Sequence, residues 1–311
     1  MRRTATTLCA AGAALAFTVL TATPQAGAAV PSATSALAAS TSADLDAAMH
    51  GEAFAWAKYT LFGEQASTEG RTAAAALWAD TSMVERGEHF AEEAALLGIP
   101  GSDVENLQAA IAGEDYETTT MYPGFAADAA RTGDTELADL FTEIAADEAR
   151  HRDAYQQALT YLTTGVGSIP APWVADVYTV TPGRAMSHGQ NLKNLLSAMH
   201  GEATASVKYD MFAATAARGG NTALSALFAS TAQIEFREHF SEEAQHAGLV
   251  GDTAANLKTS AKGENAEATH MYPNMARRAW RAGDVTAGNL FWEISFDEAR
   301  HRDAFLAELG R

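Results

Sequence analysis

Cysteine is almost absent from this chain. Its one cysteine, Cys9, lies in a short apolar segment that we expect to be removed from the mature protein. The mature chain would then have no disulfide, no thiolate metal site and no Cys-x-x-Cys motif. Its stability must come from a packed core, with bound metal as a second source.

Basic residues are also scarce, with 21 Lys and Arg against 39 Asp and Glu. Removal of residues 1–28 would leave 19 basic against 39 acidic side chains, a net charge of −20. This balance argues against nucleic acid as a partner, because nucleic-acid binding requires clustered Lys and Arg. Carboxylates buried around cations would account for much of the acidity.

Long hydrophobic runs are missing, apart from residues 8–20. Arg2 and Arg3 precede this run and Ala26-Gly27-Ala28 follows it, which is the pattern of a cleavable signal peptide. The run is too short to span a membrane. We therefore expect residues 1–28 to be a signal peptide, by general or twin-arginine export, and the mature protein to be secreted without a membrane partner. Residues 29–42, rich in Ala, Ser and Thr, are expected to form a disordered leader.

What the chain does contain is one pattern repeated twice. Residues 48–53, Ala-Met-His-Gly-Glu-Ala, recur as residues 198–203, and the offset of 150 then holds without a gap. The residues that repeat most faithfully are Glu and His within apolar helical patterns. A duplicated core alone would need to keep only the apolar periodicity. Each half is therefore predicted to build a metal site from carboxylates and imidazoles.

The repeat indicates two all-α domains, at residues 43–164 and 187–311, joined by a Pro- and Gly-containing linker at 165–186. In the first half, helices are expected near 43–66, 72–97, 103–131 and 135–162. Four helices with inward-facing acids predict a four-helix bundle in each half. Pro123 and Pro273 fall inside the third helices, where we expect a kink.

The acidic residues recur at helical spacing. Glu148 and His151 are three residues apart and share a helix face, as do Glu114 and Glu117. Two like charges about 4 Å apart cost roughly 4 kcal/mol at an effective dielectric near 20, so a cluster of such carboxylates needs cations. Mixed Glu and His ligation without Cys suits iron or manganese, and Glu-x-x-His pairs are typical of di-iron and di-manganese bundles.

The candidate ligands fall into two matching sets. The first is Glu52, Glu85, His89, Glu114, Glu117, Glu148 and His151, and the second is Glu202, Glu235, His239, Glu264, Glu267, Glu298 and His301.

These motifs resemble the ferritin-like domain of rubrerythrins. The runs are Gly51-Glu52, Asn106-Leu107, Gly113-Glu114-x-x-Glu117, Met121-Tyr122-Pro123 and Glu148-x-x-His151, and each recurs 150 residues later. The resemblance covers nearly all of both halves. It implies two ferritin-like four-helix bundles in tandem, each with a di-iron centre, although the ligand types also allow di-manganese. About four metal ions per chain are expected.

The resemblance also implies roles for individual residues. Glu85 and Glu148 would bridge two irons, Glu52 and Glu114 would be terminal ligands, and His151 would hold one iron. Glu117 and a second-helix His would be alternative ligands that exchange with redox state. The residues 150 positions later would take the same roles, and the tyrosines close to the ligands would be Tyr59, Tyr122, Tyr209 and Tyr272.

The chain departs from the rubrerythrin pattern at three points. The family has Glu-x-x-His on the second helix, whereas this interval is one residue longer. A π-bulge could restore His89 and His239 to the site, a spacing of four could suffice, or Glu88 and Glu238 could be the ligands instead. We favour the histidines, because Glu88 would add charge. The cysteine-rich rubredoxin domain is missing. The fourth helix carries Asp-Glu-x-Arg-His, in which Asp147 and Arg150 are expected to orient a ligand histidine.

The short connection between the second and third helices constrains the topology. Only residues 98–102 join them, too few to return along a helix of ~25 residues, which is ~38 Å long. Two topologies satisfy this limit: an up-down-up-down bundle in each half, or an exchange of helix pairs between the halves. We favour exchange, because two adjacent antiparallel bundles allow short loops. Exchange predicts a site that combines Glu52, Glu85 and His89 with Glu264, Glu267, Glu298 and His301.

The leading hypothesis for function is a secreted di-iron oxidoreductase that reduces hydrogen peroxide or dioxygen with electrons from an unidentified donor. The alternative is an extracellular iron-binding or sequestering protein, with ferroxidase turnover only incidental. The missing electron-transfer domain favours iron sequestration, whereas the tyrosine pattern favours a redox enzyme. A dimer is compatible with either hypothesis.

Overall fold

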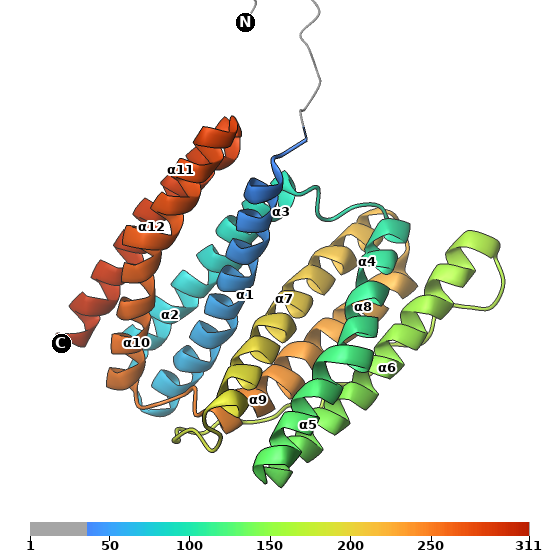
Figure 1. Cartoon of the computed structure of the whole chain (residues 1–311), viewed down its shortest axis with the longest axis horizontal. Helices are drawn as coiled ribbons and strands as arrows, with labels where there is room; N and C mark the ends of the chain where they lie inside the picture. Colours follow the sequence, from blue (N-terminus) through green and yellow to red (C-terminus); the bar gives the residue numbers. More distant parts are fainter. Residues whose placement is uncertain (1–35, 311) are drawn as a thin grey trace, which may run out of the picture. The chain divides into compact units, whose positions relative to one another are not determined.

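The computed structural model describes residues 36–310, and every regular element in that range is helical (Figure 1). The expected signal peptide and most of the expected leader lie outside the described residues. The first helix begins at Ala39, so residues 39–42, expected to be part of the leader, are helical. None of the described helices is long and apolar enough to cross a membrane.

The first half contains four long helices, two of which are interrupted by a short π-helical turn. Their segments are α1 (Ala39–Thr68), α2 (Thr72–Val84), η1 (Glu85–His89), α3 (Phe90–Leu96), α4 (Asp103–Tyr116), η2 (Glu117–Met121), α5 (Tyr122–Thr132) and α6 (Thr135–Thr164).

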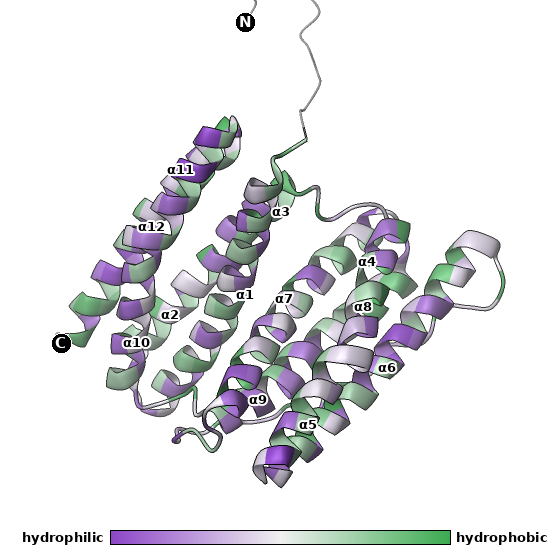
Figure 2. Ribbon diagram, in the orientation of Figure 1, coloured by the Kyte–Doolittle hydropathy of each residue, from purple (hydrophilic) through white to green (hydrophobic). Residues whose placement is uncertain are grey.

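The second half repeats this order after the linker. Its segments are α7 (Gln190–Arg218), α8 (Thr222–Ile234), η3 (Glu235–Phe240), α9 (Ser241–Ala247), α10 (Thr253–Ala266), η4 (Glu267–Met271), α11 (Tyr272–Ala282) and α12 (Val285–Leu309). Hydrophilic and hydrophobic residues are mixed along every helix, as expected where acids face inward between apolar residues (Figure 2).

The two halves exchange helix pairs, as the short connection predicted. Helices α1 and α2–η1–α3 pack with α10–η4–α11 and α12 from the other half, which forms bundle A. Helices α7 and α8–η3–α9 pack with α4–η2–α5 and α6, which forms bundle B. In Figure 1 the C-terminal helices accordingly lie beside α1 and α2, and α4–α6 lie beside α7 and α8. The alternative in which each half forms its own up-down-up-down bundle is wrong.

The connection that enforces the exchange is fixed by local hydrogen bonds. Ser102 and Glu105 form a capping box at the start of α4, with the Glu105 N–H 3.3 Å from Ser102 Oγ and the Ser102 N–H 2.8 Å from Glu105 Oε2. Asn106 Oδ1 accepts from the N–H of Gly101 at 2.8 Å. Because these bonds start α4 immediately after α3, α4 must lead away from the bundle that contains α1 and α3.

Helices α1 and α7 join the two bundles. The Phe54 ring stacks on the His200 ring at a centroid distance of 4.2 Å, and the Thr204 hydroxyl lies 2.9 Å from His50 Nδ1. Within bundle A, residues from the two halves of the chain are in direct contact. Trp78 Nε1–H, from the first half, donates to Ser260 Oγ, from the second half, at 3.0 Å. Each bundle therefore depends on residues from both halves.

A fragment that contains only residues 37–168 tests the exchange. We expect it to be unfolded or a dimer, because its two helix pairs belong to different bundles and have no partners within the fragment. Light scattering combined with circular dichroism measures both properties. A folded, monomeric fragment would contradict the exchanged topology.

Candidate metal centres

The extra residue on each second helix is accommodated by a π turn. Glu85 and His89 are the first and last residues of η1, and both side chains are buried. The i→i+5 hydrogen bonds of a π turn absorb one extra residue in the helix, so that Glu85 and His89 both face the bundle interior. Of the alternatives left open by the sequence, the π turn with histidine inward is the one in the structure. The same arrangement recurs with Glu235 and His239 in η3.

The other predicted ligands on the second helices face away from these sites. The Glu88 side chain is exposed to solvent. Glu238 is part-buried, and its carboxylate accepts a hydrogen bond from the backbone N–H of Asp176. The structure therefore places Glu88 and Glu238 outside the carboxylate clusters and His89 and His239 inside them.

Six of the predicted ligand residues gather in the centre of each bundle. Site A consists of Glu52, Glu85, His89, Glu264, Glu298 and His301. Site B consists of Glu114, Glu148, His151, Glu202, Glu235 and His239. Each site combines residues from both halves of the chain, in the pairing that the exchange predicted.

Within site A, two carboxylates are shared between two groups of ligands. Glu85 Oε2 and Glu298 Oε1 lie 3.0 and 3.1 Å from His89 Nδ1. The other oxygen of each carboxylate, Glu85 Oε1 and Glu298 Oε2, lies 3.1 Å from His301 Nδ1. Each group is completed by one more carboxylate, Glu52 beside His89 and Glu264 beside His301. The site thus offers two adjacent positions for cations, with Glu85 and Glu298 spanning both.

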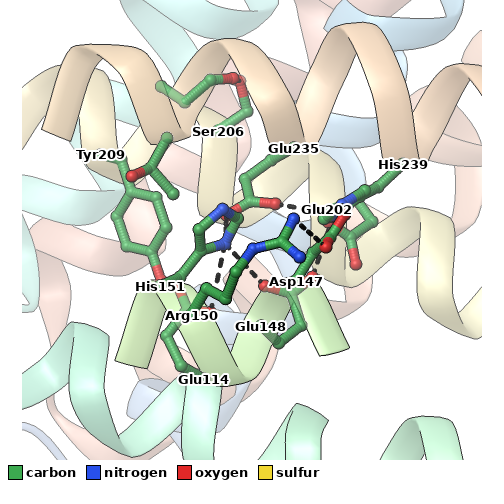
Figure 3. A network of polar contacts seen from close by, with 12 residues as sticks. Glu114, Asp147, Glu148, Arg150, His151, Glu202, Ser206, Tyr209, Glu235 and His239 are labelled. Atoms are coloured by element: carbon green, nitrogen blue, oxygen red, sulfur yellow. Dashed lines mark hydrogen bonds and ion pairs between the residues drawn. The ribbon is translucent and has the colours of Figure 1, made fainter. Parts of the chain in front are cut away.

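Site B has the same design (Figure 3). The two oxygens of Glu148 lie 3.0 Å from His239 Nδ1 and 2.9 Å from His151 Nδ1. Those of Glu235 lie 3.0 and 3.2 Å from the same two nitrogens. Glu202 completes the group at His239 and Glu114 the group at His151.

The buried carboxylates must be neutralised by protons or by cations. Burial and the charge of Glu85 raise the pKa of Glu52 to about 7, and burial and the charge of Glu148 raise that of Glu202 to about 8. Both oxygens of Glu85 and of Glu235 are buried without a hydrogen-bond partner in the described structure. Unpartnered carboxylate oxygens and imidazole nitrogens that converge within a few ångströms fit a pair of divalent cations.

In each site one histidine points Nδ1 toward the cluster, and its other ring nitrogen, Nε2, faces an aspartate outside the cluster. Asp297 Oδ2 lies 3.6 Å from His89 Nε2, and Asp147 Oδ2 lies 3.6 Å from His239 Nε2. Arg150 forms an ion pair with Asp147. This agrees with the expectation that Asp147 and Arg150 orient a ligand histidine, although the histidine concerned comes from the other half of the chain.

The four predicted tyrosines are buried against the terminal carboxylates. Tyr209 donates to Glu114 Oε1 at 2.6 Å, and Tyr59 donates to Glu264. Tyr272 donates to Glu52, and Tyr122 donates to Glu202. Every terminal carboxylate therefore has one tyrosine hydroxyl as a hydrogen-bond donor.

Glu93 and Glu243 are absent from the predicted ligand sets, because from the sequence alone the adjacent acids Glu92-Glu93 and Glu242-Glu243 are most simply interpreted as an exposed helix face. That assignment is wrong for Glu93 and Glu243, which are fully buried. Glu93 Oε1 lies 3.1 Å from the Tyr272 hydroxyl and Glu243 Oε1 lies 3.0 Å from the Tyr122 hydroxyl. Burial and the negative charge of Glu52 raise the pKa of Glu93 well above its usual range. The sequence did contain a signal for this burial. Glu93 follows His89 by four residues and therefore lies on the same helix face as a predicted ligand.

Glu117 and Glu267 lie beside the sites but outside both ligand groups. Each is half-buried at the first position of a π turn, η2 or η4, that the sequence analysis did not anticipate. Pro123 and Pro273 follow directly, at the start of α5 and α11. The structure thus has a π turn where the prolines predicted a kink, a common feature of helices at functional sites.

The fold and these clusters define a four-helix-bundle protein with two carboxylate- and histidine-rich sites, each of which could hold a pair of metal ions. The family model named Rubrerythrin matches residues 44–159 and 233–309. The chain belongs to the rubrerythrin family.

The curated relatives agree with this assignment. A rubrerythrin from Nitratidesulfovibrio vulgaris is 36% identical over 136 residues, which cover 40% of this chain and 71% of that protein. A rubrerythrin from Porphyromonas gingivalis is 37% identical over 131 residues, covering 38% of this chain and 65% of the relative. A nigerythrin from N. vulgaris is 33% identical over 132 residues, covering 38% and 65%. No solved structure matches the chain significantly.

Metal removal should destabilise the protein more at high pH than at low pH. Because the pKa values of Glu52 and Glu202 are raised to about 7 and about 8, the folded apo-protein retains protons that the unfolded chain releases above about pH 4.5. Apo-protein stability therefore falls as pH rises through this window. Metal affinity rises with pH, because the cation displaces those protons. Melting temperatures with and without Mn²⁺, measured at about pH 5.5 and about pH 8, should differ more at the higher pH. An equal or smaller difference at high pH would contradict these assignments.

Glu93 should tolerate replacement by glutamine in the apo-protein. Burial and the charge of Glu52 raise the pKa of Glu93 and so favour its neutral, protonated form. Glu93→Gln then replaces one neutral group by another and should change the free energy of unfolding by less than about 1 kcal/mol. Glu92→Gln, on the exposed face, is the matched control. A much larger loss from Glu93→Gln alone would show that a charged carboxylate is needed there.

Proposed function

We propose that this protein is a di-iron oxidoreductase that reduces hydrogen peroxide or dioxygen at two centres per chain. The observation that carries the proposal is the position of Glu85 and Glu298, each of which has one oxygen beside each histidine nitrogen of site A. Glu148 and Glu235 have the same position in site B. Membership of the rubrerythrin family supports the same chemistry.

In this proposal, Glu85 and Glu298 would hold both irons of site A, while Glu52 with His89 and Glu264 with His301 would each hold one. Bound iron would supply the one-electron chemistry that the side chains lack. The resemblance implied that Glu85 and Glu148 would bridge one pair of irons. Because the halves exchange helices, Glu85 would instead bridge together with Glu298, and Glu148 together with Glu235.

The surrounding residues provide the protons and the dry environment that the reaction needs. Reduction of one peroxide to two waters consumes two electrons and two protons. The hydroxyl of Tyr272 lies between Glu52 and Glu93, so that a proton on Glu93 is one hydrogen-bonded step from a ligand carboxylate. The buried apolar side chains of Phe90 and Phe291 belong to the same bundle and help to exclude bulk water. Electrons must come from a separate donor.

Peroxide turnover by the iron-loaded protein tests this function. The protein is loaded anaerobically with Fe²⁺ and mixed with hydrogen peroxide in the presence of a chemical reductant. We expect about four irons per chain, two in each bundle, and many turnovers of peroxide. The variants Glu85→Gln and Glu235→Gln should each lose the ions of one site, and the double variant should lose turnover. Glu88→Gln, which changes an exposed acid near Glu85, is the control and should keep both the bound iron and the peroxide turnover.

The same experiment separates the two functions considered from the sequence. A single oxidation of the bound iron, without turnover under any reductant, would support iron sequestration and contradict the oxidoreductase. Full turnover by the double variant would contradict the assignment of the sites.

A further inference from the structure

The two sites differ in what covers them. The His301 side chain is 14% exposed, whereas that of His151, its counterpart in site B, is 2% exposed. The other histidine of each site, His89 or His239, is 2% exposed in both. The difference is therefore confined to one face, where the fourth helix of each bundle carries its ligand histidine.

The segment that covers His151 belongs to the linker. The Trp173 ring lies against the His151 imidazole, with a centroid distance of 5.2 Å. Together with Asp147, Arg150, Asp176 and Glu238, these two residues line a cavity of about 150 Å³. Within residues 36–310, His301 has no such aromatic cover.

Hydrogen bonds fix the linker along the second helix of bundle B. The backbone N–H of Trp173 donates to Ser230 Oγ at 3.3 Å, and that of Asp176 donates to the Glu238 carboxylate. The N–H of Tyr178 donates to the carbonyl of Arg237 at 2.8 Å, and the N–H of Thr181 donates to Gln245 Oε1 at 2.8 Å. Residues 173–181 therefore form a strap that is anchored on α8, η3 and α9.

The cavity under the strap is small and polar, which limits what can pass. A few water molecules or one small oxidant fit in about 150 Å³, but a hydrated cation with a chelator does not. Passage of anything larger requires the Trp173–His151 contact to open. At site A, in the described structure, passage on the same face requires no comparable opening.

We propose that the linker makes the two metal sites kinetically unequal, with Trp173 as the residue that controls access to site B. Site A then takes up and releases metal ions faster than site B. This inference rests on the metal binding of the proposed function, but not on its peroxide turnover.

Release of Co²⁺ from single-site variants tests the inference. Glu235→Gln leaves site A as the intact site, and Glu85→Gln leaves site B. Each variant is loaded with Co²⁺, and loss of the visible cobalt absorption is followed after addition of excess EDTA. We expect release from site B to be roughly tenfold slower than from site A, the order of change expected when one aromatic contact must open first.

Replacement of Trp173 then identifies the cause. In the site B protein, Trp173→Ala should raise the release rate roughly to that of site A, whereas in the site A protein it should have no effect. Trp292→Ala removes a tryptophan from α12 and is the matched control, which should leave release from site B unchanged. Glu238→Ala, which removes the acceptor for the Asp176 N–H, should act in the same direction as Trp173→Ala and provides a second variant if Trp173→Ala is unstable.

Three results would overturn the inference. The first is an equal rate of Co²⁺ release from the two sites. The second is an unchanged release rate from site B in both Trp173→Ala and Glu238→Ala, and the third is an equal increase in the release rates of both sites by Trp173→Ala. Equal rates with the ions bound in both variants would overturn the inference alone. If neither variant nor the parent chain bound Co²⁺, Fe²⁺ or Mn²⁺, the proposed function would fail together with it.

Discussion

The constraint on which this structure depends is the burial of four mutually close carboxylates between two imidazoles in each bundle. Such a cluster is unfavourable in a protein interior unless protons or cations neutralise it. The helices that supply these groups come from both halves of the chain. Neutralisation of either site therefore also holds the two halves together, so that the proposed metal binding and the exchanged topology would support one another.

The π turns show how the helices adapt to this constraint. The Glu–His interval on each second helix is one residue longer than the Glu-x-x-His of the rubrerythrin pattern. The π turns η1 and η3 absorb that extra residue and keep Glu85 with His89, and Glu235 with His239, directed into the sites, at the cost of less favourable helix geometry. The turns η2 and η4 lie at the matching position on the third helices and begin at Glu117 and Glu267. All four irregularities lie at the level of the sites, where local strain is expected to be concentrated.

The sequence predicted much of this arrangement, because its strongest signals were periodic and repeated. The 150-residue offset pointed to the residues that cluster in the two candidate sites, with Glu117 and Glu267 lying just outside them, and the few residues between α3 and α4 predicted the exchange of helix pairs. Position along a helix was less informative about burial. Glu93 was assigned to an exposed face next to Glu92, since nothing local distinguishes a surface acid from one that accepts a hydrogen bond from a tyrosine of a distant helix, Tyr272. The strap is a tertiary feature of the same kind, because no periodicity in residues 165–186 indicates that Trp173 packs against His151.

The most direct test of the account is the position of the metal ions themselves. Anomalous X-ray diffraction from crystals grown with Fe²⁺ or Mn²⁺ locates each ion independently of activity. The account predicts two neighbouring peaks in each bundle, with Glu85 and Glu298 between the pair in one and Glu148 and Glu235 between the pair in the other. Bundles without anomalous peaks, or peaks confined to exposed acids at the surface, would contradict it.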